Sequence, residues 1–213
     1  IEYYISRSIR NAAYIAVLTD TDFSDVQSKG NSVITELRGK TDSNYSLKCI
    51  SIRYAMDDKS QTYKYFICNE TVESSGALKT NSTPASDTMV FDPCYFDGIY
   101  PKVIISRVQQ EQSDGSKKDM PAVQIDVEIF DDPLMRGGKG DTTASPTSSD
   151  LVFSGTGYTV LRNIELSQQD TSLNQPFKIT EPLPKSLNPG DNSFKETYIF
   201  YVERKLAATP TTT

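Results

Sequence analysis

The sequence contains no histidine, no tryptophan and only three cysteines among its 213 residues. Without histidine, the chain cannot form a Ser-His-Asp or Cys-His catalytic set, or any metal site that needs an imidazole ligand. Three cysteines are also too few for a four-cysteine zinc centre. These absences exclude much of conventional enzymology, and we expect a protein that is not an enzyme and that needs no cofactor.

The sequence also lacks a basic character and a long apolar run. Its net charge is −6 and its isoelectric point is about 4.8, whereas nucleic-acid binding needs cations that neutralise phosphates. We therefore expect no nucleic-acid partner. No stretch approaches the roughly 20 apolar residues that span a bilayer. The first residues, Ile1 to Tyr4, do not include an initiator methionine or the basic and apolar segments of a signal peptide.

Residues 1–18 show the periodicity of an amphipathic helix. At 100° per residue, one apolar stripe collects the positions that we expect to form the core face of this helix: Ile1, Ile5, Ile9, Ala12 and Ala16. No capping residue precedes Ile1, which leads us to expect that the helix continues upstream. An uncapped terminal helix is the alternative.

The remainder of the chain has the patterns of β-strands. Residues 122–130 alternate apolar and polar side chains, which predicts a strand with one buried face. The other predicted strands lie at 47–54, 63–68, 88–91, 102–108, 158–164 and 194–202. The sequence thus predicts an α+β fold in which the N-terminal amphipathic helix packs on antiparallel sheet. We expect one domain over residues 1–206, with its β-rich part at 45–204, and a flexible tail at 207–213.

Two groups of side chains are weak candidates for metal binding or covalent linkage. Asp20, Asp22 and Asp25 follow the predicted helix, but they lack the further oxygen ligands of a calcium loop, so a polar turn is the preferred interpretation and no metal site is predicted. If the first hairpin turns between residues 58 and 59, Cys49 faces Cys68. Cys94 is another candidate partner, and three free thiols are the alternative to a disulfide.

Several segments occur in the order typical of one family. Ser6–Ile15 contains an arginine, an Ala-rich turn and a tyrosine, Ser51–Asp57 precedes Tyr63–Tyr65, and Tyr158–Asn163 ends in Leu-Arg-Asn. This order resembles the type IV pilin and type II secretion pseudopilin superfamily, in particular minor pilins and J-type pseudopilins. The resemblance covers about residues 1–166 and implies a pilin-like head.

This resemblance implies a non-enzymatic subunit of a type IV pilus or secretion filament, with a role in assembly, at the tip or in adhesion. Its partners would be other pilin or pseudopilin subunits, reached through a helix upstream of Ile1 that anchors the protein in the membrane before assembly. The head would lie at the bacterial surface or outside the cell, and we expect the isolated head to be a monomer.

Two other classes compete with this interpretation. A secreted β-rich carbohydrate- or receptor-binding module is the first, and a carboxylate-based hydrolase ranks below it because no acid pair stands out. The upstream codons discriminate between the leading classes. About 20 apolar residues after a small-residue cleavage site indicate a pilin, whereas a conventional signal peptide ending before Ile1 indicates the module.

Overall fold

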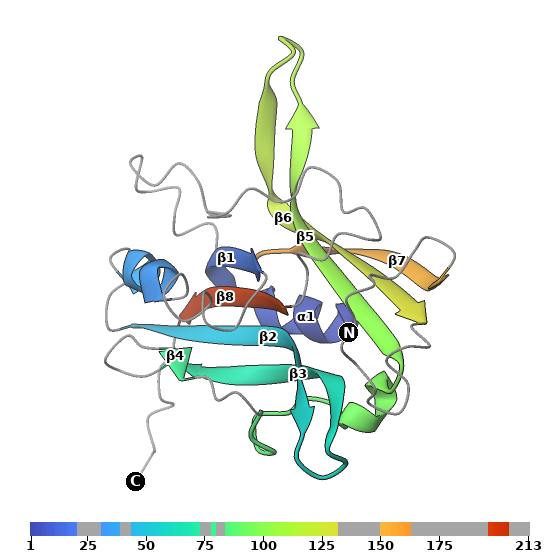
Figure 1. The fold of residues 1–213 in the computed structure, drawn as a ribbon. Helices are drawn as coiled ribbons and strands as arrows, with labels where there is room; N and C mark the ends of the chain where they lie inside the picture. Colours follow the sequence, from blue (N-terminus) through green and yellow to red (C-terminus); the bar gives the residue numbers. More distant parts are fainter. Residues whose placement is uncertain are drawn as a thin grey trace, which may run out of the picture.

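The computed structural model describes residues 1–20, 31–38, 44–72, 78–79, 84–131, 150–162 and 196–204. They form two antiparallel sheets that face each other (Figure 1). The five-stranded sheet has the order β1 (Ala12–Asp20), β8 (Glu196–Arg204), β2 (Tyr45–Asp57), β3 (Thr62–Val72) and β4 (Leu78–Lys79). The three-stranded sheet has the order β5 (Ile99–Glu111), β6 (Lys117–Asp131) and β7 (Leu151–Val160).

The predicted α+β, pilin-like fold, with a helix over residues 1–18 packed on antiparallel sheet, is wrong. The described chain is mostly β, and its α-helices are short: α1 (Glu2–Ile9) and a second helix at residues 31–38. The 3₁₀ helix η1 spans Pro93–Phe96. None of the helices in the described part is long and apolar enough to cross a membrane.

The chain leaves the helical conformation after Ile9 because of the residues that follow. The segment Ala12–Asp20 contains Tyr14, Ile15 and Val17, whose aromatic or β-branched side chains favour strands. It is also apolar almost throughout, and all residues from Ala12 to Leu18 are buried. Such a run fits a strand covered on both faces as well as it fits a helix, so periodicity alone does not distinguish the two.

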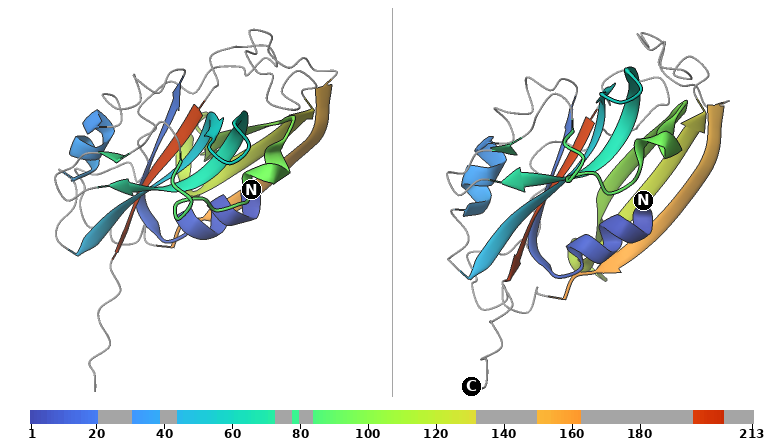
Figure 2. Two further views of the ribbon diagram at one scale, coloured as in Figure 1. Left: turned by 60° about the horizontal axis from the view of Figure 1, so that its bottom comes forward. Right: turned by 90° about the horizontal axis from the view of Figure 1, so that it is seen from below.

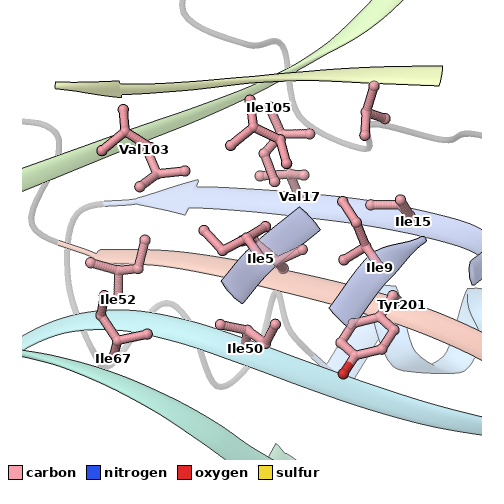
Figure 3. Packing of buried hydrophobic residues seen from close by; sticks show 14 of the residues in the cluster. Ile5, Ile9, Ile15, Val17, Ile50, Ile52, Ile67, Val103, Ile105 and Tyr201 are labelled. Carbon is pink, nitrogen blue, oxygen red and sulfur yellow. The ribbon is translucent and has the colours of Figure 1, made fainter. Parts of the chain in front are cut away.

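The main core lies between the two sheets and includes α1. Inward side chains of β2 and β3, such as Ile50 and Ile67, face Val103 and Ile125 of the other sheet. Ile5 and Ile9 of α1 enter this core and are fully buried (Figure 3). Figure 2 shows α1 between the two sheets on their open side.

The residues of the expected helix stripe consequently lie in two elements. Ile1 is partly buried against the core, and Ile5 and Ile9 lie on α1. Ala12 and Ala16 are fully buried, but they lie on β1. Ala16 belongs to a second apolar cluster, in which Val33, Ile34 and Leu37 of the helix at 31–38 pack with side chains of β1 and β8.

The first hairpin has a different register from the one expected. Cys49 pairs with Glu70, and Ser51 pairs with Cys68, so the two cysteines are not opposite each other. The turn is centred between residues 59 and 60 rather than 58 and 59: Gln61, with φ of 55°, donates its amide proton to the carbonyl oxygen of Asp57 at 2.8 Å. This turn shifts the pairing by two residues, and Cys49, Cys68 and Cys94 are all free thiols.

The remaining strands differ from the prediction in extent. The hairpin of β5 and β6, joined at Gly115 with φ of 79°, is longer than predicted and projects beyond the two sheets (Figure 1). Strand β7 ends at Val160, although the prediction placed a strand over 158–164. The predicted strand at 88–91 is reduced to one bridge between Cys68 and Met89. The predicted tail at 207–213 lies outside the described residues.

We predict that Ile5→Asp lowers the free energy of unfolding by at least about 3 kcal/mol, because it places an unpaired carboxylate between the sheets. Chemical denaturation measures this change. The matched control is Tyr3→Asp on the same helix, where the side chain is 73% exposed. It should change stability by no more than about 0.5 kcal/mol. Equal effects of both substitutions would show that α1 is not part of the core.

A second prediction concerns the Asp57 carboxylate in the β2–β3 turn. It accepts hydrogen bonds from the Ser60 hydroxyl at 2.6 Å and the Lys59 amide at 3.2 Å, and it pairs with Lys64. The Ser60 hydrogen bond is the largest contribution that holds the pKa of Asp57 below its ordinary value of 3.8. Since the folded state has the lower pKa, the stabilisation is present above the ordinary value and is lost as pH falls through the folded value.

We therefore expect Asp57→Ala to destabilise the protein by about 1–2 kcal/mol at neutral pH. The difference between wild type and variant should shrink once the pH falls below the ordinary carboxyl pKa of 3.8. Urea denaturation at a series of pH values measures both curves. A difference that stays constant down to the lowest pH at which the protein folds would contradict this assignment.

Candidate functional site

The residues singled out for metal binding do not form a site in the described structure. Asp20 is the last residue of β1, whereas Asp22 and Asp25 lie outside the described residues. Within the described part, no cluster of three cysteine, aspartate or glutamate residues could hold a metal ion.

The cysteines do not provide a nucleophile. Cys49 and Cys68 are buried, and burial raises the pKa of both thiols, that of Cys68 to about 12. The exposed thiol of Cys94 also has a raised pKa, first because of its hydrogen bond with Asp92. A cysteine nucleophile needs a lowered pKa, so all three thiols have the opposite property.

A buried ionic cluster lies on the outer face of the five-stranded sheet. The Arg53 side chain is 1% exposed and places Nη1 3.2 Å from Oε1 of Glu70 and Nε 4.0 Å from Oε1 of Glu196. Two hydroxyl groups donate to the same carboxylates: Ser51 to Glu70 at 2.5 Å and Tyr198 to Glu196 at 2.7 Å. The cluster therefore brings together residues from β2, β3 and β8.

The electrostatics of this cluster favour a structural role. Burial acts to lower the pKa of the Arg53 guanidinium, but its interactions with Tyr198, Glu70 and Glu196 outweigh burial, and the pKa is raised. The phenol of Tyr198 has a raised pKa, mainly because it is buried. The cation thus stays charged between its two carboxylates. Since Arg53 is almost inaccessible to solvent, we attribute the cluster to folding rather than to substrate binding.

A polar groove lies on one side of α1. It has a volume of about 490 Å³, within the range of small-molecule sites. The helix contributes Tyr4, Arg7 and Ser8, and Tyr4 donates a hydrogen bond to Oδ1 of Asn69 at 2.6 Å. On the opposite wall, Lys48 pairs with Glu203. The groove offers hydroxyls, amides, the cations Arg7 and Lys48, and the carboxylates of Glu70 and Glu203.

The other side of α1 adjoins an exposed apolar strip along β7. Among the described residues, seven large hydrophobic side chains are exposed, and five of them lie on β7: Leu151, Val152, Phe153, Tyr158 and Val160. Tyr3 of α1, 73% exposed, is the sixth. We call these six residues the β7 strip. By strand alternation Tyr158 and Val160 lie on the outer face, whereas Phe153 shares the α1 side with Gly155 and Gly157. The six residues therefore flank the β7 edge from both faces. Surface apolar side chains are normally scattered, so their concentration along one edge indicates an interaction surface.

The contacts between α1 and β7 hold the two parts of the strip together. The hydroxyl groups of Ser6 and Thr159 are hydrogen-bonded, and the amide of Arg162 donates to the carbonyl oxygen of Arg10 at 2.8 Å. Gly157 leaves room for the side chain of Glu2, which a Cβ atom at this position would meet. The helix therefore runs along the inner face of β7 while the outer face stays open.

Strand β7 is also unusual among the sheet edges that the structure describes. β1 is buried, β4 has only two residues, and β5 carries Pro101 and Lys102 near its start. Burial, shortness, proline and lysine are the usual protections of an edge against pairing with another chain. Strand β7 pairs only with β6 in the described part, and its ten residues include no charge and no proline. Its edge is therefore suited to accept a further strand.

The sequence analysis missed both long-range features. Arg53, Glu70 and Glu196 come from distant segments, and no local pattern indicates that they meet. For the β7 strip a signal existed, because Leu151-Val152-Phe153 is an uncharged apolar run between polar segments. Comparison with family models, curated proteins and solved structures finds no match.

We predict that Arg53→Met destabilises the fold by about 3–5 kcal/mol, because it leaves two carboxylates buried without their cation. The double variant Arg53→Met, Glu70→Gln removes one of these charges and should recover part of the loss. Thermal and chemical denaturation of the two variants measure the difference. If the double variant is as unstable as the single one, the uncompensated charge of Glu70 is not the cause.

Proposed function

We propose that this chain is a non-enzymatic subunit of a pilin-like or pseudopilin-like filament, and that it contacts neighbouring subunits through the β7 strip. The observation that carries the proposal is the strip itself: of the seven large hydrophobic side chains that are exposed among the described residues, six lie on α1 and β7. A subunit interface needs such an apolar centre, and tyrosine is among the residues enriched there.

The sequence resemblance supports the same proposal. Two of the segments that carry it, Ser6–Ile15 and Tyr158–Asn163, are far apart in the chain. They meet where Ser6 bonds to Thr159 and where the amide of Arg162 donates to Arg10. The segments typical of the family thus adjoin the strip. The proposal places the protein at the cell surface or outside the cell. It rests on the strip and on the resemblance of these segments, and the two-sheet fold is not used as support for it.

A photocrosslinking experiment in the native host tests this proposal. A photoreactive amino acid replaces Tyr3 or Tyr158 of the strip, and Tyr95, which is 69% exposed on η1, serves as the control position. We expect covalent adducts with other pilin or pseudopilin subunits, identified by mass spectrometry, from the two strip positions only. Absence of such adducts, or equal adducts from Tyr95, would contradict the proposal.

The polar groove favours a second candidate, a carbohydrate-binding module. Its lining includes Tyr4 and Tyr201, the cations Arg7 and Lys48, and the carboxylates of Glu70 and Glu203. Lys48 pairs with Glu203, so Arg7 is the cation that an acidic sugar would bind first. Binding of acidic oligosaccharides to the purified chain, lost in Arg7→Ala and Lys48→Ala but retained in Tyr158→Lys, would support this candidate. No binding by wild type to such oligosaccharides would eliminate it.

A further inference from the structure

We infer that β7 pairs in antiparallel fashion with β7 of a second copy, about a two-fold axis at Thr156, so that the two three-stranded sheets form one six-stranded sheet. This inference deepens the proposed function by naming a partner of the β7 strip, and it rests on that strip being an interface. It does not depend on which filament the protein enters.

One edge of β7 is open in the described part, where β7 pairs only with β6. The backbone groups on its other side can therefore bond to a further strand. An antiparallel pair of identical strands satisfies both edges with one set of contacts, and such a two-fold contact closes without generating a chain of copies.

The sequence of β7 suits pairing with a second copy of itself. Val152-Phe153-Ser154-Gly155-Thr156-Gly157-Tyr158-Thr159-Val160 is nearly symmetric about its centre. When Thr156 faces its own copy, Val152 faces Val160 and Gly155 faces Gly157. Each aromatic residue then faces a small hydroxyl residue: Phe153 faces Thr159, and Tyr158 faces Ser154. Phe153 and Tyr158 thus each meet a small side chain, the central pairs join glycine with glycine and threonine with threonine, and the valines meet at the two ends.

The symmetry of a sheet restricts the register. A two-fold axis perpendicular to the sheet keeps every residue on its original face, and paired residues of antiparallel strands share a face. Paired positions must therefore both be even or both be odd, which the axis at Thr156 satisfies. An axis one residue earlier, at Gly155, would place Asp150 against Val160 and pair Phe153 with Gly157. The register at Thr156 keeps charge out of the paired residues Val152–Val160, and just beyond them it places Asp150 opposite Arg162, which carry opposite charges.

The charged side chains nearest to β7 on the outer face lie on β6. On the outer face, the closest carboxylates are Asp126 and Glu128 on β6, opposite Thr156 and Ser154. The two copies of β6 would lie three strand spacings apart, about 14 Å. This distance exceeds the Debye length of about 8–10 Å at physiological salt, so their repulsion is largely screened. The Thr156 hydroxyl already donates to Asp126 at 2.6 Å.

The inner face holds two larger side chains beside the paired glycines. A Cβ atom on Gly155 would meet the ring of Phe153, and one on Gly157 would meet the Glu2 side chain of α1. The glycines therefore leave the space that Phe153 and Glu2 occupy where the two helices approach the new sheet. Tyr3 on α1 remains exposed beside this edge and is available to cover the added strand.

Sedimentation equilibrium of the purified chain measures the association. We expect a reversible dimer, rather than the monomeric head expected from the sequence, with a dissociation constant below about 1 mM, the weak end of specific association. Tyr158→Lys places a charge in each half of the pairing and should raise this constant by about tenfold or more. Tyr95→Lys is the matched control, because Tyr95 is equally exposed but lies on η1, and it should leave the constant unchanged.

Site-specific disulfide formation tests the register. In a Cys94→Ser background, the two native thiols left, Cys49 and Cys68, are buried. Thr156→Cys should form a disulfide-linked dimer with diamide, because facing strand positions lie within disulfide range. Val152→Cys is the control: in the same register, two copies of residue 152 are about 27 Å apart. The double variant Val152→Cys, Val160→Cys should cross-link.

Two results would overturn the inference: a wild-type monomer up to about 1 mM, or disulfide formation that is as fast at residue 152 as at residue 156. These outcomes are distinguishable from failure of the proposed function. A monomer that still gives adducts with other filament subunits at Tyr3 and Tyr158 keeps the strip as a filament interface and rejects only the self-pairing. A dimer without such adducts retains the pairing and rejects the filament.

Discussion

The position of α1 between the two sheets is the constraint on which the rest of the structure depends. Helix α1 has only eight residues, too few to be stable alone in water, so its conformation depends on the burial of Ile5 and Ile9. In return, it fills the open side between the sheets. It also contacts both of them, through Tyr4 with Asn69 on β3 and through Ser6 with Thr159 on β7. The polar groove and the β7 strip exist because α1 separates them.

Local patterns predicted much of the β structure. The alternation of Val123, Ile125 and Val127 with polar residues identified β6 and its buried face, and both hairpins of the prediction occur. The predicted helix over residues 1–18 was wrong from residue 12 onwards, because an almost entirely apolar run satisfies helix and strand periodicity alike. The conformation of β1 depends on its pairing with β8, which lies far away in the sequence. No local pattern contains that information.

The candidate sites likewise include one feature that a local sequence pattern indicates and one that it does not. The uncharged run at 151–153 was visible in the sequence, but its importance depends on β7 being an edge strand, which is a property of topology. The Arg53 cluster was not predictable, because its carboxylates come from Glu70 and Glu196 and meet only after three strands align. It concentrates charge where it stabilises the sheet, while the exposed edge of β7 is left without charge.

Hydrogen exchange tests the central claim, that α1 is an integral part of the inter-sheet core. The amide of Ile5 donates to the carbonyl oxygen of Ile1 at 3.0 Å, and the amide of Arg10 donates to Ser6 at 3.1 Å. If α1 is held between the sheets, these amides should exchange as slowly as those of Val123 to Val127 on β6, through global unfolding. Exchange of the α1 amides by local opening, while β6 stays protected, would contradict the account.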